Sequence, residues 1–188
     1  MPSRLLTPPS AEPVTLAEAK AFLRVEHDAD DDVIAALVTA ARCHVEAQTR
    51  RALLTQVWRL TRDAWPIDGR IPVAPSPLQA LAAARVHDAA GAAHALDPQV
   101  FLVDAAGAQL VFAPGSLPAP GRAAGIELDI AVGYGDAAAD APQPLRQAVR
   151  MLVAHWYENR GVAAAEAGAA VLPLSVAALL APYRVVTL

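Results

Sequence analysis

The middle of the chain cannot form a long helix. Four prolines and a glycine fall within WPIDGRIPVAPSP, residues 65–77, and a proline removes a backbone donor and clashes with the preceding helical turn. Further along, GIELDIAVGYG places Ile126, Leu128, Ile130 and Val132 at alternate positions, which predicts a strand with one buried face. QVWRLTRD, just before the prolines, is a second strand candidate. Residues 55–135 therefore predict a small antiparallel sheet.

Two short segments in this block repeat a turn pattern. HDAAGA at residues 87–92 and VDAAGA at residues 103–108 each start a turn with an aspartate and end it with a glycine. An aspartate side chain accepts hydrogen bonds from the backbone that follows it, and glycine adopts a left-handed conformation at little cost. Each segment therefore predicts a hairpin with a bulge.

Helical patterns stand on both sides of the sheet region. TLAEAKAFLRV, residues 15–25, opens with Thr15 and carries Glu18 three residues later, which is the capping-box pattern of a helix start. The acidic run HDADDD, residues 27–32, precedes an apolar pattern that predicts a long helix through about Leu53. Because the run lacks the glycine and distal glutamate of an EF-hand loop, we interpret it as stabilising the helix N-terminus and not as a calcium site.

The carboxyl-terminal block returns to a helical pattern. Pro144 favours a helix start and Gly161 a helix end, and apolar residues recur on one face between them. A glycine- and alanine-rich linker follows, then a short helical turn that stops near Pro182, and an extended tail, RVVTL. The residues that we expect in the core of the helical part are Ile34, Leu37, Val45, Leu152 and Trp156.

Together these patterns predict an α+β fold. We expect a helical bundle built from residues 1–54 and 136–180, a small antiparallel β domain inserted at residues 55–135, and an extended tail at residues 181–188. With 188 residues, of which 55% are hydrophobic, the chain is long enough to bury a core.

Composition argues against several classes of function. A net charge of -4 disfavours a protein whose main task is to bind phosphates, because such binding needs clustered Lys and Arg. The single cysteine, Cys43, cannot form an internal disulfide, so we expect a reducing compartment; its place among alanines predicts a buried structural thiol. Prolines interrupt the first residues, and Pro173 interrupts the apolar tract at 167–183, so we expect neither a secretory signal nor a membrane span.

LRQAVRMLVAHWYENR, residues 145–160, crowds ionisable side chains at the end of a helix. His155 and Glu158 are three residues apart and hence neighbours on the helix surface, as two ligands of one metal would be. The other long helix offers His44 and Glu46, which are two apart and point in different directions. We therefore favour a role in packing and assembly, with no catalytic residue, metal or cofactor. A small metal-dependent helical enzyme built around His155 and Glu158 stays an alternative.

The order of these segments resembles a known family. VTLAEAKAFLRV, an acidic gap, DDVIAALVTAARCHVEAQTRRAL, a proline-broken β region, IAVGYG and PLRQAVRMLVAHWYENR follow one another as in the head–tail connector, or adaptor, proteins of long-tailed bacteriophages and of phage-derived gene transfer agents. The resemblance covers residues 14–184, and its most specific pieces are residues 16–24, 46–53 and 154–160. The block at 55–135 is longer than in compact members, which are chiefly helical.

The resemblance implies a structural protein and not an enzyme. Members assemble as a ring, usually of twelve copies, beneath the portal protein at the capsid vertex. The ring extends the channel through which DNA passes without sequence-specific binding, and it contacts the next connector or stopper protein. Assembly would take place in the bacterial cytoplasm and end in the neck of the particle. Another tail-completion or stopper role remains an alternative.

The family also implies residues that make contacts. Its C-terminal segment reaches into the portal, and the matching residues here are Tyr183, Arg184, Val185, Val186, Thr187 and Leu188. An extended β-branched tail can add a strand to an exposed sheet edge. A ring uses head-to-tail contacts, for which we expect the arginines near helix ends, Arg50, Arg51 and Arg160, to pair with Glu46, Glu158 or acids of a neighbour. The sequence leaves open whether these pairs form within or between subunits.

Overall fold

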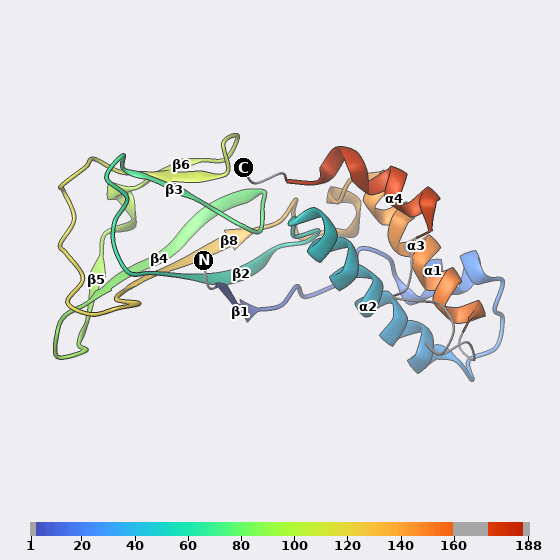
Figure 1. Cartoon of the computed structure of the whole chain (residues 1–188). Helices are drawn as coiled ribbons and strands as arrows, with labels where there is room; N and C mark the ends of the chain where they lie inside the picture. Colours follow the sequence, from blue (N-terminus) through green and yellow to red (C-terminus); the bar gives the residue numbers. More distant parts are fainter. Residues whose placement is uncertain (1–2, 160–172, 186–188) are drawn as a thin grey trace. The chain divides into compact units, whose positions relative to one another are not determined.

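The computed structural model describes residues 3–159 and 173–185 and confirms an α+β fold. The chain forms two units, drawn in Figure 1. The β unit consists of Met1–Pro9 and Thr55–Gly133, and the helical unit of Ser10–Leu54 and Tyr134–Leu188. Each unit is therefore built from two separate stretches of the chain.

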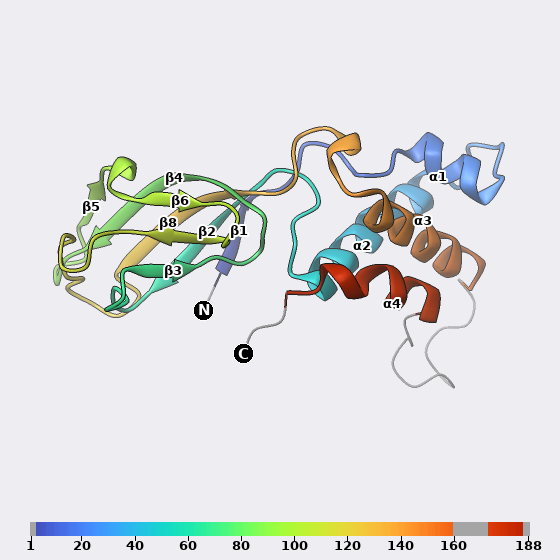
Figure 2. The same ribbon diagram turned by 90° about the horizontal axis from the view of Figure 1, so that it is seen from above.

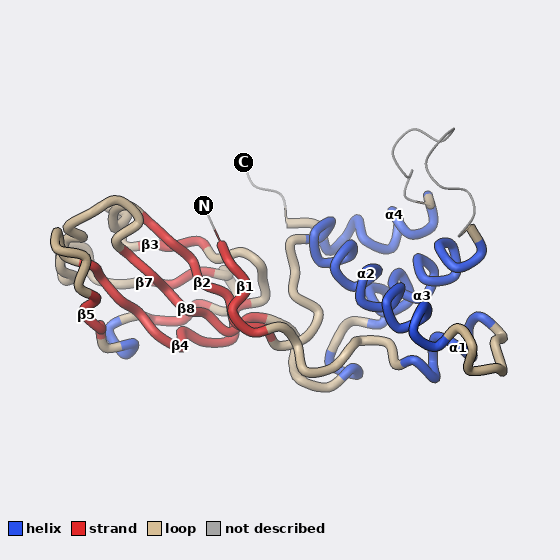
Figure 3. Tube along the Cα trace, turned by 90° about the horizontal axis from the view of Figure 1, so that it is seen from below, coloured by secondary structure: helices blue, strands red, loops and turns tan. Residues whose placement is uncertain are grey.

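The β unit contains two antiparallel sheets, whereas the sequence predicted one. The larger sheet has the strand order β1-β2-β8-β4-β5 and the smaller one the order β3-β7-β6. Figures 1 and 3 show the smaller sheet beside the larger one. The strands are β1 Ser3–Thr7, β2 Gln56–Arg62, β3 Arg70–Pro72, β4 Leu78–His87, β5 Ala93–Leu96, β6 Leu102–Asp104, β7 Gln109–Val111 and β8 Ile126–Val132; a 3-10 turn, η1, spans Pro98–Val100.

Strand β8 forms the centre of the larger sheet. Its alternate residues Ile126, Leu128, Ile130 and Val132 are fully buried, as the alternation predicted. Neighbouring strands add apolar residues at the same register, since Leu60 of β2 lies opposite Leu128. Buried side chains of the smaller sheet, among them Ile71 and Leu110, complete the core of the unit.

Both repeated turn segments close hairpins, as predicted, but the strand pairing next to each turn is regular and lacks the bulge that we expected. HDAAGA joins β4 to β5, and VDAAGA joins β6 to β7. In the first turn the backbone N–H of Ala92 donates to Asp88 Oδ1 at 2.9 Å, and Gly91 has φ +87°. In the second turn the N–H of Gly107 donates to Asp104 Oδ1 at 2.9 Å. The aspartates therefore accept the backbone hydrogen bonds that the turns would otherwise leave unmade.

Strand β1 is an element that the sequence patterns did not indicate. We placed residues 1–54 in the helical part, but Ser3–Thr7 pairs with β2 in the β unit. Its sequence, SRLLT, lacks apolar alternation. The strand forms because β2 offers an edge with unpaired backbone groups.

The helical unit contains α1 Leu16–Leu23, α2 Asp31–Thr49, α3 Gln143–Glu158 and α4 Leu174–Leu180, with 3-10 turns η2 at Ala138–Asp140 and η3 at Ala181–Tyr183 (Figure 2). The capping box of α1 is present, with Thr15 and Glu18 in the expected roles. Helix α2 ends at Thr49 and not near Leu53, because Arg50 turns into the left-handed region with φ 56°.

The acidic run before α2 does more than stabilise the helix N-terminus. Asp30 is the N-cap residue but makes no side-chain cap hydrogen bond. Asp28 and Asp31 instead each lie 2.6 Å from Lys20 Nζ. Two acids therefore tie α1 to the start of α2, while Asp31 and Asp32 also occupy the first turn, where the helix dipole favours negative charge.

The core of the helical unit lies among α2, α3 and α4. Ile34, Val45 and Leu152 are almost completely buried, whereas Leu37 and Trp156 are half-buried at its margin.

Cys43 is exposed on α2, so our expectation of a buried thiol was wrong. The reason is the helical spacing, which places Cys43 away from the buried positions 38, 41 and 45. Among the described residues, no helix is both long and apolar enough to cross a membrane.

Candidate functional site

The C-terminal segment lies against the end of α2. Arg51 Nε donates to the main-chain oxygen of Tyr183 at 2.8 Å, and the N–H of Val185 donates to Thr49 O at 3.2 Å. Arg184 Nη2 adds a longer contact of 3.3 Å to Gln48 Oε1. Of the six tail residues, Tyr183, Arg184 and Val185 are therefore fixed along one helix end. Val186, Thr187 and Leu188 lie outside the described residues. The part of the tail at Ala181–Tyr183 is a 3-10 turn and not extended.

Arg51 also acts on a tyrosine at this place. Burial raises the pKa of the Tyr134 hydroxyl, and the nearby guanidinium of Arg51, which hydrogen-bonds to it, opposes that shift. Arg51 thus contacts both Tyr134, after the last β strand, and Tyr183, after α4. Arg51 therefore connects a residue that precedes η2 and α3 to a residue that follows α4.

Glu46 is held within its own subunit. Its carboxylate accepts from Arg42 Nη1 at 2.8 Å and from the backbone N–H of Leu53 at 2.8 Å. The second bond stabilises the turn that follows α2, because it satisfies a buried backbone donor. The side chain is only 13% exposed, so its carboxylate is largely buried and is paired with groups of the same subunit.

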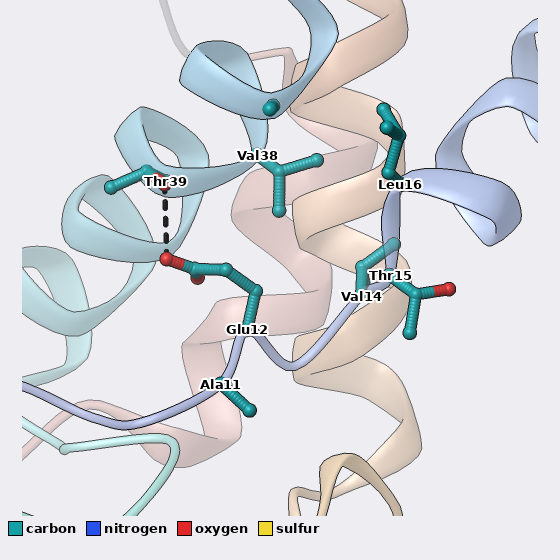
Figure 4. Close-up of a pocket in the computed structure, with 8 residues that line it drawn as sticks. Ala11, Glu12, Val14, Thr15, Leu16, Val38 and Thr39 are labelled. Carbon is teal, nitrogen blue, oxygen red and sulfur yellow. Dashed lines mark hydrogen bonds between the residues drawn. The ribbon is translucent and has the colours of Figure 1, made fainter. Parts of the chain in front are cut away.

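Arg42 connects Glu46 to the segment before α1. Its Nε donates to Glu12 Oε2 at 2.8 Å, and Glu12 Oε1 accepts from the Thr39 hydroxyl at 3.0 Å (Figure 4). Burial alone would lower the pKa of Arg42, but Glu12 and Glu46 outweigh it and the pKa is raised. The guanidinium therefore stays charged and holds residues 11–16 against α2.

A hollow of about 300 Å³ lies between that segment and α2. Figure 4 shows Val14 and Val38 facing one another across it, with Glu12 beside Thr39. Its lining is mainly apolar and consists of Ala11, Glu12, Val14, Thr15, Leu16, Ala35, Val38 and Thr39. Its one carboxylate is already paired, so the hollow suits an apolar side chain better than a charged ligand.

Arg146 fixes the other side of the same segment. It is only 8% exposed, and it donates from Nε to Pro13 O and from Nη2 to Glu18 Oε1, both at 2.8 Å. Arg150 approaches the same carboxylate at 3.3 Å. A backbone hydrogen bond from Thr15 and the two arginines together lower the pKa of Glu18. The start of α1 is therefore bound to α3 by charged groups.

The end of α3 packs against neighbouring helices. Tyr157 donates to Asp30 Oδ2 and joins α3 to the start of α2, while His155 and Glu158 are both exposed. His44 meets the Trp156 ring edge-on. Within the described ranges, no group of three or more His, Cys, Asp or Glu side chains is placed to hold a metal ion. Arg160 lies outside those ranges.

The β unit carries a charged cluster on the outer face of its larger sheet. Asp129 of β8 accepts from Arg59 of β2 at 2.7 and 2.9 Å and from Arg85 of β4 at 2.7 Å. Glu127 lies 3.1 Å from Arg59 Nη1. Burial would raise the pKa of Asp129, yet the two arginines lower it below its usual value. Three neighbouring strands are thus joined by paired charges.

Sequence reasoning named the arginines at helix ends and missed Arg42 and Arg146, which are the buried ones. For Arg42 a signal existed, because Glu46 is four residues later and such pairs meet on a helix. For Arg146 none existed, since its partner carbonyl at Pro13 is 133 residues away. Of the residues that we named as assembly contacts, Arg51 bonds to the tail, Glu46 bonds to Arg42 and to the amide of Leu53, and Glu158 is exposed at the end of α3.

Residues 13–90 match the family model described as phage gp6-like head-tail connector protein. No curated protein matches the chain.

Three solved structures share the fold over the whole chain. Each is 26% identical to this chain in sequence, and each alignment covers 100% of this chain and 97% of the other. One is described as the neck of an empty GTA particle computed with C6 symmetry, with a TM-score of 0.81. Another is described as the virion of a native gene transfer agent particle, with a TM-score of 0.80. The third is the neck of a native GTA particle computed with C12 symmetry, with a TM-score of 0.74.

Proposed function

We propose that this chain is a head–tail connector protein and that it assembles as a ring of twelve copies in the neck of a phage or gene transfer agent particle. The observation that carries the proposal is the likeness over the full chain to a neck protein in a particle computed with C12 symmetry. A twelvefold axis places twelve equivalent copies around one channel. Ring closure then requires head-to-tail contacts that repeat around the axis.

In the proposed arrangement the ring lies between the portal protein and the next connector or stopper protein. DNA passes through the ring without sequence-specific contacts. The net charge of -4 supports this role, because strong nonspecific binding to DNA comes from the neutralisation of phosphates by Lys and Arg. The subunits would fold in the bacterial cytoplasm and then join the particle, and no catalytic step is part of the function.

The C-terminal tail is the proposed contact with the portal. Its first part is anchored by Arg51 and Thr49, so residues 186–188 follow a point fixed on α2. A fixed origin reduces the conformational entropy that a binding tail loses when it docks.

Purified protein mixed with portal rings of the same particle tests the proposal by native mass measurement. We expect a complex that contains one portal ring and twelve copies of this chain. A subunit that is folded by circular dichroism but does not associate with the portal would contradict the function. A complex with another number of copies would contradict the twelvefold ring alone.

A further inference from the structure

One side of α2 is exposed and uncharged over most of the helix. The residues on it are Val33, Ala36, Ala40, Cys43 and Ala47, which we call the α2 stripe. They recur at three- and four-residue spacing, so they lie on one face, and all five are exposed. A helix on the surface of a single subunit normally turns charged or polar residues outward. An outer face made of alanine, valine and cysteine is typical of a helix that another helix covers.

The hollow described above continues this surface. Thr39, which lines the hollow, is three residues after Ala36 and four residues before Cys43, so it adjoins two residues of the stripe on the helix surface. Of the lining residues labelled in Figure 4, Thr39 is exposed, whereas Val38 and Val14 are buried. Small side chains let another helix approach closely, and the hollow beside them leaves room for one large apolar side chain.

The same unit has a second uncharged exposed face, on α4. That helix, LSVAALL, contains no charged residue. Val176 and Leu180 are buried, whereas Leu174 and Ala178 of α4 and Ala181 at its C-cap are exposed; we call these three the α4 ridge. Leu174 is 86% exposed. A leucine in this position leaves its apolar surface in water unless a partner covers it.

A ring whose subunits meet head to tail needs two different faces on each subunit. We propose that the α4 ridge of one copy packs on the α2 stripe of the next, with Leu174 in the hollow. The two faces are complementary, because one is a row of small residues beside a hollow and the other presents a large side chain. Neither the stripe nor the ridge carries a charge, and Glu12, the one carboxylate in the lining of the hollow, is already paired with Arg42. The inference rests on the proposed ring and names the surfaces that close it.

The single cysteine of the chain allows a direct test, because it lies on the stripe. In the variant Ala178→Cys, Cys43 of one copy and the new thiol of the next would be neighbours. A short cross-linker with two maleimide groups, each of which adds one cysteine thiol, should then give a ladder of covalent oligomers beyond the dimer. The double variant Cys43→Ser with Ala178→Cys is the matched control and should give no ladder. A Cys43-to-Cys43 dimer as the sole product would overturn the proposal, since it would mean that two stripes face one another.

Charge insertion gives a second test in the presence of portal rings. Ala40→Glu places a carboxylate in the middle of the stripe and should abolish the twelve-copy complex, with an unchanged circular dichroism spectrum. Ala17→Glu, at an exposed position on α1, should leave the complex intact. A full ring with Ala40→Glu, or no ladder with Ala178→Cys, would overturn the inference while the proposed function stood. Failure of the unaltered protein to join the portal would count against the proposed function itself.

Discussion

Arg51 Nε donates to the main-chain oxygen of Tyr183 at 2.8 Å, across 132 residues of sequence. The bond joins the residue that follows the cap of α2 to the residue that ends η3. Because the acceptor is a backbone oxygen, the hydrogen bond fixes the path of the main chain at Tyr183 and not merely the position of a side chain. The proposed portal contact therefore starts from a position that α2 determines.

Replacement of Arg51 by alanine should loosen that path. A hydrogen bond from a charged group contributes about 1.5–3 kcal/mol, and partial exposure places this one at the lower end. We expect a loss of about 1.5 kcal/mol in the free energy of unfolding, measured by urea denaturation, together with faster hydrogen exchange at the Val185 amide. Arg24→Ala, at an exposed position after α1, is the control. Equal exchange at Val185 in both variants would show that Arg51 does not hold the segment.

Deletion of residues 186–188 separates docking from folding. The variant keeps Arg184 and Val185, and with them the contacts to Gln48 and Thr49. We expect an unchanged melting temperature and a loss of association with portal rings, measured by native mass. In the control variant, residues 186–188 are replaced by three alanines and not deleted. If the shortened chain still docks, the tail has no part in portal binding.

Arg146→Met should destabilise the helical unit more than Arg150→Met. Arg146 is buried and bonds both Pro13 and Glu18, whereas Arg150 makes longer contacts. Breaking a buried ion pair on one side costs about 3–5 kcal/mol, while a more exposed pair contributes about 1 kcal/mol or less. Urea denaturation of the two variants measures the difference. Similar losses would indicate that Glu18 does not need the buried partner.

Asp129→Asn should weaken the β unit in a way that depends on pH. Arg59 and Arg85 lower the pKa of Asp129 in the folded state below the usual value of 3.8. The stabilisation is therefore present above about pH 4 and is lost as the pH falls through the folded-state pKa. We expect the substitution to cost about 2 kcal/mol at pH 7 and progressively less below pH 4, measured by urea denaturation at each pH. Asp136→Asn, at an exposed position, is the control. A constant difference across this range would contradict the assignment.

The larger elements of the fold could be predicted because their patterns are local. The alternation around Leu128 indicated β8, and the pair Thr15 and Glu18 indicated the start of α1. The ends of elements were harder. Helix α2 stops four residues earlier than expected, because Arg50 adopts a left-handed conformation. Glycine usually occupies such a position, and its absence here left the helix end without a signal in the sequence. Strand β1 could not be foreseen, since its strand conformation comes from pairing with β2 and not from its own residues.

The contacts in the helical unit were partly accessible from the sequence. The sequence indicated that arginines near helix ends would pair, and Arg51 does so, although its acceptor is a carbonyl of the tail. Glu46 was chosen as an assembly contact, yet its carboxylate binds Arg42 and the amide of Leu53. Whether an arginine is buried depends on the packing of distant segments, as with Arg146 and Pro13. Helical spacing alone does not contain that information.

Strand β1 has to be present when the β unit is expressed by itself, because it covers the β2 edge of the larger sheet. A fragment of residues 55–133 would look like a complete β domain in the sequence, but it would lack the strand that covers the β2 edge. An uncovered edge recruits strands from other molecules, so such a fragment should aggregate. A circularly permuted β domain, with residues 3–9 joined after Gly133 through a flexible linker, would keep that edge closed and is the form to express for work on this unit alone.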